Sequence, residues 1–401
     1  MWIGQLRELC LTFWKKSRAR LLGFANAPEI REIRKQLQNA LHDGPRPALD
    51  ESQLSAEDRA LCQLIRQRTE EANRNNVTRT AAYLDIYKRC PELHWALLAH
   101  MVSRNGGWNM TDLCGDLIGR TMETGEREGF FHFLERANYL IFGDAYPQLL
   151  LYEASRDAGR PLFHLLPCFG VTRFMDLIWA RFWKTHDSEL LTLALVVNEQ
   201  NFIEDRVVRH RDYSSVVESF EFTAQTLLNL TQVVFPFYQE GKQKVQLAGT
   251  TVKTFRSLAE RIDTGRRLYA ILFGREDVYQ GALRWAEETP HTASRGDYWP
   301  HLYAKEPSGA AQAKRYRPRL NGCSLKKGAL PFYSPALSAV WPDVERPAPS
   351  GGEDWCRDAE CVEELYGTKP DKSYNVTKFY CATLMVVERA VAAETWLDHR
   401  T

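Results

Sequence analysis

The chain has 401 residues, of which 44% are hydrophobic and 11% aromatic, so it is long and apolar enough to bury a large core. Its 52 lysine and arginine residues nearly balance its 51 aspartate and glutamate residues, giving a formal net charge of +1. This balance speaks against a dedicated nucleic-acid-binding protein, since such proteins usually carry a basic excess. The stretch 295–327 is basic and the stretch after Pro342 is acidic. We interpret them as two solvated faces that attract each other, with nucleic-acid binding as the weaker alternative.

The first 24 residues, MWIGQLRELCLTFWKKSRARLLGF, predict an amphipathic N-terminal helix. The apolar side chains that share one of its faces are Trp2, Ile3, Leu6, Leu9, Cys10, Phe13 and Trp14. The apolar run from Leu9 to Trp14 is too short for the core of a signal peptide, and the basic residues follow this run instead of preceding it. We expect this helix to dock on the protein's own core. The alternative is that residues 2–16 bind a membrane surface or an unidentified protein partner.

Residues 25–54 predict a helix followed by a linker rich in proline, aspartate and serine. The apolar residues that recur at helical spacing in it are Ile30, Ile33, Leu37 and Leu41. Ser55 and Asp58 predict a capping box at the start of a main helical domain over residues 55–285. Helices predicted within this domain cover residues 81–102, 130–152, 173–183, 190–208, 216–238 and 252–273. The run 190–197 is apolar almost all round, which indicates a helix near the centre of the body.

Residues 286–401 have a different character, because prolines and large aromatic residues alternate along much of this segment. Each proline removes a backbone donor and pushes the residue before it into an extended conformation, which prevents long helices. The aromatic residues argue against disorder. We predict an ordered, irregular belt packed on the main domain and closed by a helix over residues 376–397. The expected fold class is therefore all-α, a large multi-helical globular body with an irregular C-terminal belt.

Nine cysteines are scattered along the chain. An odd number, with several cysteines inside apolar runs, favours reduced core thiols in a cytosolic protein over a disulfide framework. Cys356 and Cys361 are the only near pair, and their spacing is not that of a zinc knuckle. The sequence also lacks the motifs of phosphate-binding loops, dinucleotide-binding folds, zinc proteases and serine hydrolases. We therefore expect neither a metal nor a cofactor.

The first polar cluster lies in residues 94–115, HWALLAHMVSRNGGWNMTDLCG. We predict that one helix ends before Gly106 and Gly107 and that another begins after them. The two histidines are six residues apart and diverge by about 120° around a helix, so they do not bind one metal. We interpret the cluster as a buried corner in which Arg104 and the asparagine amides bind loose backbone groups, with a polar pocket as the alternative. Residues 73–80, NRNNVTRT, repeat this composition.

Two further clusters contain residue types that carry chemistry. Apolar helices are interrupted by three carboxylates, Asp144, Glu199 and Glu204. We expect such carboxylates to form internal salt bridges. A di-metal site is disfavoured, because these helices lack the Glu-x-x-His pairs that such sites use. The predicted loop 290–303, PHTASRGDYWPHLY, gathers residues of general acid–base and nucleophile type. The residues of the candidate pocket are His100, Arg104, Asn105, Trp108, Asn109, Asp144, Glu199, Glu204, His291, Asp297 and His301.

Several stretches, taken together, resemble one family. These stretches are NRNNVTRTAAYLDIYKRCPELHWALLAHMVSRNGGWNMTD, FLERANYLIFGDAYPQLLLYE, NEQNFIEDRV, DYWPHLY and YSPALSAVWP. They look like the uncharacterised YppC-like proteins of spore-forming Bacillus relatives, over most of residues 70–342. The amphipathic N-terminus and the acidic C-terminal loop fall outside the resemblance. It implies a bacterial, cytoplasmic protein, and it supplies no catalytic residue because the family has no established activity.

The function is not stated by any motif, and whether the chain is an enzyme stays open. We expect a non-catalytic helical interaction protein of the bacterial cytoplasm. It is peripheral to the membrane if residues 2–16 follow the alternative given above and bind a membrane surface instead of the core. The alternative is a hydrolase whose pocket joins Arg104, Asn105 and Asn109 to the His291–His301 loop. That alternative predicts that these side chains converge on one concave pocket.

Overall fold

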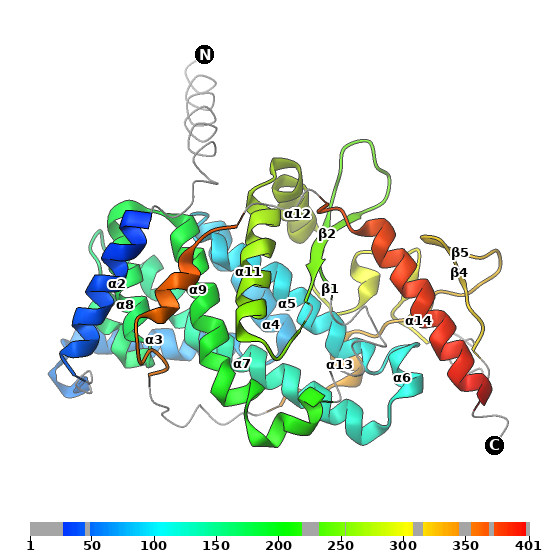
Figure 1. Ribbon diagram of the computed structural model, residues 1–401, viewed down its shortest axis with the longest axis horizontal. Helices are drawn as coiled ribbons and strands as arrows, with labels where there is room; N and C mark the ends of the chain where they lie inside the picture. Colours follow the sequence, from blue (N-terminus) through cyan, green and yellow to red (C-terminus); the bar gives the residue numbers. More distant parts are fainter. Residues whose placement is uncertain are drawn as a thin grey trace, which may run out of the picture.

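The computed structural model describes residues 27–44, 49–218, 232–252, 254–307, 316–344, 354–368 and 373–397. This part of the chain is mostly helical (Figure 1), which confirms the predicted all-α class. The predicted N-terminal amphipathic helix lies outside the described residues. Within the described ranges, no helix is long and apolar enough to cross a membrane.

The longer helices form the body of the molecule. They are α2 (Ala27–His42), α3 (Ala56–Ala72), α4 (Asn76–Arg89), α5 (His94–Asp112), α7 (Thr124–Asp157), α8 (Arg173–Thr185), α9 (Ser188–Ile203), α11 (Leu258–Phe273), α12 (Glu276–Glu288) and α14 (Thr377–Leu397). The short helical segments are η1 (Glu51–Gln53), α6 (Ile118–Thr121), η2 (Phe163–Phe169), η3 (Glu204–Val208), η4 (Arg211–Tyr213), η6 (Arg295–Asp297), α13 (Leu337–Val340) and η7 (Glu360–Leu365). In Figure 1, α2 and α8 lie at one end and α14 at the other, with α9 and α11 between them.

Helix α9 occupies the centre because its sequence offers no polar face over its first turns. Residues 190–198 are all buried, and α9 contacts α5, α7, α8 and α11. This confirms the prediction of a central helix over 190–197. The Ser55 half of the predicted capping box is present: the Ser55 side chain accepts a hydrogen bond from the backbone N–H of Asp58 at 3.0 Å.

The predicted turn at Gly106 and Gly107 is wrong, because α5 runs through both residues without a break. Neither glycine has a positive φ, so a turn conformation is not why they are there. A Cβ on Gly107 would lie 2.3 Å from Oδ1 of Asn76 and 2.7 Å from Nε2 of His291. The missing side chain is therefore a notch in the helix surface, into which polar groups of other segments fit.

Three predicted helix ranges also need correction. The range 216–238 ends in a strand, β1 (Gln232–Phe237), which pairs antiparallel with β2 (Gln246–Thr251). All but one of the β1 residues are buried, so the run has no alternation that would distinguish it from a buried helix. The range 81–102 is divided between α4 and α5, and the helix expected from residue 252 begins at Leu258, where Ser257 caps it.

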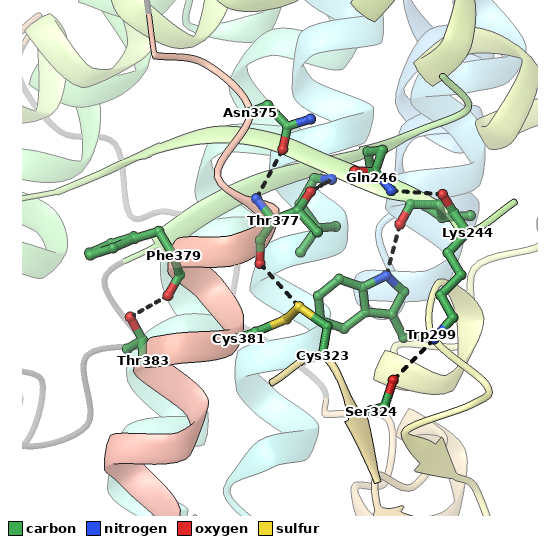
Figure 2. The surroundings of a disulfide bond; sticks show 12 residues. Lys244, Gln246, Trp299, Cys323, Ser324, Asn375, Thr377, Phe379, Cys381 and Thr383 are labelled. Carbon is green, nitrogen blue, oxygen red and sulfur yellow. Dashed lines mark hydrogen bonds between the residues drawn. A yellow bond between two sulfur atoms is a disulfide. The ribbon is translucent and has the colours of Figure 1, made fainter. Parts of the chain in front are cut away.

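The C-terminal segment contributes short strands and α14. Strands β3 (Tyr303–Ala304) and β6 (Phe332–Tyr333) pair in parallel, and β4 (Leu320–Asn321) pairs antiparallel with β5 (Ser324–Leu325). A disulfide joins Cys323, in the β4–β5 turn, to Cys381 of α14 (Figure 2). This bond corrects the expectation that the cysteines are all reduced. The domain boundaries drawn from the sequence stay a prediction.

Candidate functional site

A cavity of about 200 Å³ lies between α4, α5, α7, α9, α11, β1 and the segment that joins β2 to α11. Its apolar lining residues are Tyr83, Trp95, Leu98, Ala99, Val102, Ile141, Val196, Val233, Val252, Phe255 and Leu268. One of these lining residues, Val102, is itself 36% exposed at the molecular surface. An apolar cavity of roughly 150 Å³ already holds benzene, and most ligand sites combine such a lining with a few polar groups. The volume and the lining therefore suit a small ligand.

Glu199 supplies one of the polar groups of this cavity. Burial raises the pKa of its carboxyl to about 8, and hydrogen bonding from Gln200 and Trp95 opposes that shift. Gln200 donates to Oε1 of Glu199 at 3.1 Å, and its own oxygen accepts a hydrogen bond from Nε of Arg261 at 2.9 Å. Arg261 is held in turn by an ion pair with Glu204. Glu199 is thus mostly a neutral acid at neutral pH, oriented by neighbours that are themselves fixed.

Arg79 stands at another wall of the same cavity. It forms an ion pair with Glu135, and the side chains of these two residues are 1% and 3% exposed. Its Nη1 also donates to Oδ1 of Asn73 at 3.2 Å. Its buried Nε has no hydrogen-bond partner among the residues that the structure describes. Because buried donors are nearly always paired, this N–H is a donor that a bound ligand can satisfy.

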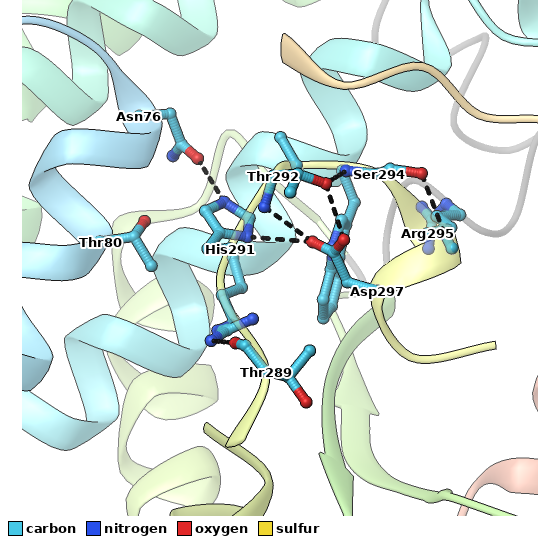
Figure 3. A network of polar contacts seen from close by, with 12 residues as sticks. Asn76, Thr80, Thr289, His291, Thr292, Ser294, Arg295 and Asp297 are labelled. Atoms are coloured by element: carbon cyan, nitrogen blue, oxygen red, sulfur yellow. Dashed lines mark hydrogen bonds and ion pairs between the residues drawn. The ribbon is translucent and has the colours of Figure 1, made fainter. Parts of the chain in front are cut away.

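A chain of polar groups leads from the cavity wall into the interior, and Figure 3 shows its inner members Asn76, His291 and Asp297. Ser103 lines the cavity, and Nδ2 of Asn76 donates to its carbonyl oxygen at 2.9 Å. On its other side, Asn76 accepts from Nε2 of His291 at 2.9 Å. Nδ1 of His291 lies 3.8 Å from Asp297, too far for a hydrogen bond. Burial, and then the nearby charge of Arg104, place the pKa of His291 well below its usual value, so the ring is neutral.

The residues of the predicted corner bind backbone atoms of distant segments. Arg104 donates to the carbonyl oxygen of Thr289 at 2.5 Å and lies over the Trp285 ring. Burial lowers the pKa of Arg104 to about 10. His100 accepts from Nε of Arg104 at 2.9 Å. Asn105 exchanges two hydrogen bonds with the backbone of Val234 in β1, at 2.8 and 2.9 Å. These contacts fix α5 against the strand and against the segment after α12.

The remaining predicted residues lie at several places. Trp108 packs beside His291 and Tyr298, and Asn109 accepts a hydrogen bond from Arg295 at 3.4 Å. Asp144 accepts from Asn198 and Gln148, and burial raises its pKa to about 7. His301 lies 5.8 Å from the Trp299 ring, measured between ring centres.

Of the eleven predicted residues, one lines the cavity: Glu199. Four others come together in the interior beside it: His100, Arg104, His291 and Asp297. Sequence reasoning missed Arg79, Gln200 and Arg261 as lining residues. The Arg/Asn-rich stretch 73–80 was a signal for the first of them, because it contains both Asn76 and Arg79. Among the described residues, no group of three or more His, Cys, Asp or Glu side chains is placed to hold a metal ion.

Comparison with known proteins assigns the chain to a family. A family model described as "Protein of unknown function (DUF2515)" matches residues 71–366. The chain belongs to this family. It is 40% identical over 245 residues to the uncharacterized protein YppC of Bacillus subtilis (strain 168), which covers 60% of this chain and 73% of that protein. The YppC-like resemblance is thereby confirmed, and no solved structure matches the chain. All residues that line the cavity fall within the range of the DUF2515 model.

Proposed function

We propose that this chain is a non-catalytic binding protein whose cavity holds a small, uncharged and mostly apolar molecule with a hydrogen-bond acceptor directed at Glu199. The observation that carries the proposal is the cavity itself, which combines about 200 Å³ of space and an apolar lining with a neutral acid. A neutral carboxyl donates an O–H, which a carbonyl or ether oxygen accepts. The unpaired Nε of Arg79, which also lines the cavity, offers a second donor.

Isothermal titration calorimetry with two probes of similar shape tests this proposal. 2-Acetylnaphthalene carries a carbonyl acceptor, and 2-ethylnaphthalene does not. We expect the acetyl compound to bind about fivefold more tightly, since one hydrogen bond in a buried site contributes about 1 kcal/mol. Replacing Glu199 with Leu should remove this difference while both compounds still bind. Equal affinities of the two probes for the wild-type chain would contradict the role of Glu199.

A cavity-filling variant tests the location. Ala99 lines the cavity, and a phenylalanine there fills part of the space. We expect Ala99→Phe to abolish binding of both probes. The matched control is Ala382→Phe, at an exposed position of α14, which should bind as the wild type does. If Ala99→Phe binds both probes with unchanged affinity, the ligand site is elsewhere. A melting curve of each variant checks that the chain is folded.

We also propose that the protein acts in the bacterial cytoplasm and that residues 2–16 bind a membrane surface or a protein partner. The support is the amphipathic pattern of that segment, which lies outside the described residues. Flotation with vesicles that contain anionic lipid, using the full chain and a chain that lacks residues 1–24, separates the two binding modes. Deletion should abolish flotation if the segment binds the membrane. Equal flotation of both chains rules out membrane binding by this segment.

A hydrolase is the second candidate, and it rests on the closeness of His291 and Asp297. The geometry supports it less well. Asn76 stands between the Ser103 backbone and His291, while Arg104 and Asn105 are engaged with backbone groups. General base catalysis needs the base within hydrogen-bond reach of the proton it removes. We therefore place binding before hydrolysis.

A further inference from the structure

Two thiols converge at the edge of a second hollow, of about 380 Å³, between α9, α11 and residues 354–368. The Sγ atoms of Cys356 and Cys361 both donate to the carbonyl oxygen of Asp358, at 3.4 and 4.0 Å. Both Sγ atoms thus lie against the same backbone oxygen, which brings the two thiols together. Neither is in a disulfide. The sequence spacing did not reveal this contact, which depends on the turn that η7 makes after Asp358.

The two thiols differ in how they are held. Trp355 donates to Oδ1 of Asn198 in α9 at 3.0 Å, and Asp354 accepts from the hydroxyl of Thr172 at 2.6 Å. The chain just before Cys356 is therefore anchored on two helices. Cys356 is buried, with 4% of its surface exposed, whereas Cys361 is partly exposed. A small reagent that enters the hollow meets Cys361 first.

We propose that Cys356 and Cys361 form a dithiol site that reduces low-molecular-weight disulfides and is itself converted to an intramolecular disulfide. The thiolate of Cys361 attacks one sulfur of the small disulfide, a mixed disulfide forms, and one small thiolate leaves. The thiolate of Cys356 then attacks Sγ of Cys361, the Cys356–Cys361 bond forms, and the second small thiolate leaves. Two electrons pass to the small disulfide, and the two protons of the cysteine thiols go to the two leaving thiolates.

The charges of the hollow select among disulfides. Its lining contains three carboxylates and one guanidinium, those of Asp358, Glu360, Glu364 and Arg357. Such a surface attracts cations, so a cationic disulfide such as cystamine reaches the dithiol faster than the anionic glutathione disulfide. The neighbouring Cys356 thiol, and then burial, raise the pKa of the Cys361 thiol. Exchange therefore accelerates as the pH rises above neutral, because the thiolate is the nucleophile.

The test uses the full chain, incubated with cystamine, quenched with acid, and then alkylated after denaturation. Peptide mass mapping reads the state of each cysteine. We expect Cys356 and Cys361 to be lost to alkylation together, linked to each other, with no cysteamine retained. Cystamine should react about tenfold faster than glutathione disulfide at low ionic strength, and added salt should reduce that ratio.

Three variants separate the steps. Cys356→Ser removes the resolving thiol, so one cysteamine should stay attached to Cys361. Cys361→Ser leaves the buried thiol alone, which should react far more slowly. Cys90→Ser, which removes a buried thiol that does not line the hollow, is the matched control and should react as the wild type does.

Two results would overturn the proposal. In the first, Cys361 of the wild-type chain stays open to alkylation at saturating cystamine. In the second, the wild type and Cys356→Ser retain the same adduct on Cys361. Because the first result is read in the unmodified chain, it does not depend on whether a variant folds. The result is also independent of ligand binding in the cavity that Glu199 lines.

Discussion

The close packing of other segments against Gly107 in α5 predicts that alanine substitutions at the two adjacent glycines, Gly106 and Gly107, differ in their effect on stability. A methyl group on Gly107 would lie 2.3 Å from Oδ1 of Asn76 and 2.7 Å from Nε2 of His291, well inside contact distance. Asn76 is completely buried, and its two amide atoms are both hydrogen-bonded. Gly107→Ala therefore breaks the Asn76–His291 bond and leaves buried polar groups unsatisfied, at about 1–3 kcal/mol each. Alanine regains roughly 1 kcal/mol through its helix propensity.

We expect a net destabilisation of about 2–4 kcal/mol for Gly107→Ala. The matched control is Gly106→Ala in the same helix turn. Its Cβ would meet the Asn138 amide at 3.3 and 3.4 Å, and a shift of a few tenths of an ångström in that side chain relieves the contact. Gly106→Ala should therefore be neutral or stabilising by up to about 1 kcal/mol. Urea unfolding followed by circular dichroism measures both. Equal effects of the two variants would refute the notch, because a glycine turn would make both costly.

Three further predictions concern the polar groups of the interior. The pKa of Glu199 is about 8 in the folded chain, above its ordinary 4.5, so the contribution of this group to stability is lost as the pH rises from 4.5 to 8. The melting temperature of Glu199→Gln should therefore fall less over this pH range than that of the wild type. Asn105→Ala removes both bonds to β1 and should cost about 2–4 kcal/mol in urea unfolding, and clearly more than Asn109→Ala; equal costs would contradict the anchoring role. Arg79→Met leaves Glu135 buried without its partner and should cost about 3–5 kcal/mol, most of which the double variant with Glu135→Leu recovers; a double variant no more stable than the single one would contradict this account.

The elements that the sequence predicted correctly are those whose pattern is local. Helix α9 was found because residues 190–197 are apolar without interruption, and the start of α3 because Ser55 precedes the helix by the right spacing. The errors arose where one pattern has two physical causes. A buried strand such as β1 and a buried helix are both continuous apolar runs. A glycine pair can mark either a turn or a place where other residues pack closely against a helix. Here the residues that pack against Gly107 are Asn76 and His291, which lie about 30 and 184 positions away along the chain, so no local pattern reveals them.

The candidate site was harder to predict than the fold, because its parts come from six elements. Glu199 was identified as an unusual carboxylate inside an apolar helix, which is a local signal. The side chains that orient it were not, since Arg261 reaches Gln200 from another helix. The disulfide shows the same limit: composition gives the number of cysteines, but not that residues 323 and 381 meet.

Helix α9 connects the two hollows through neighbouring residues. Glu199 faces the cavity, while Asn198 is buried and bonded on one side to Asp144 and on the other to Trp355, the residue before Cys356. Closing the Cys356–Cys361 bond leaves this connection intact only if Trp355 keeps its place. A displaced Trp355 would leave Oδ1 of Asn198 without this partner, at a cost of about 1–3 kcal/mol. Oxidation of the dithiol is therefore easiest when the Trp355 side chain keeps its hydrogen bond to Asn198.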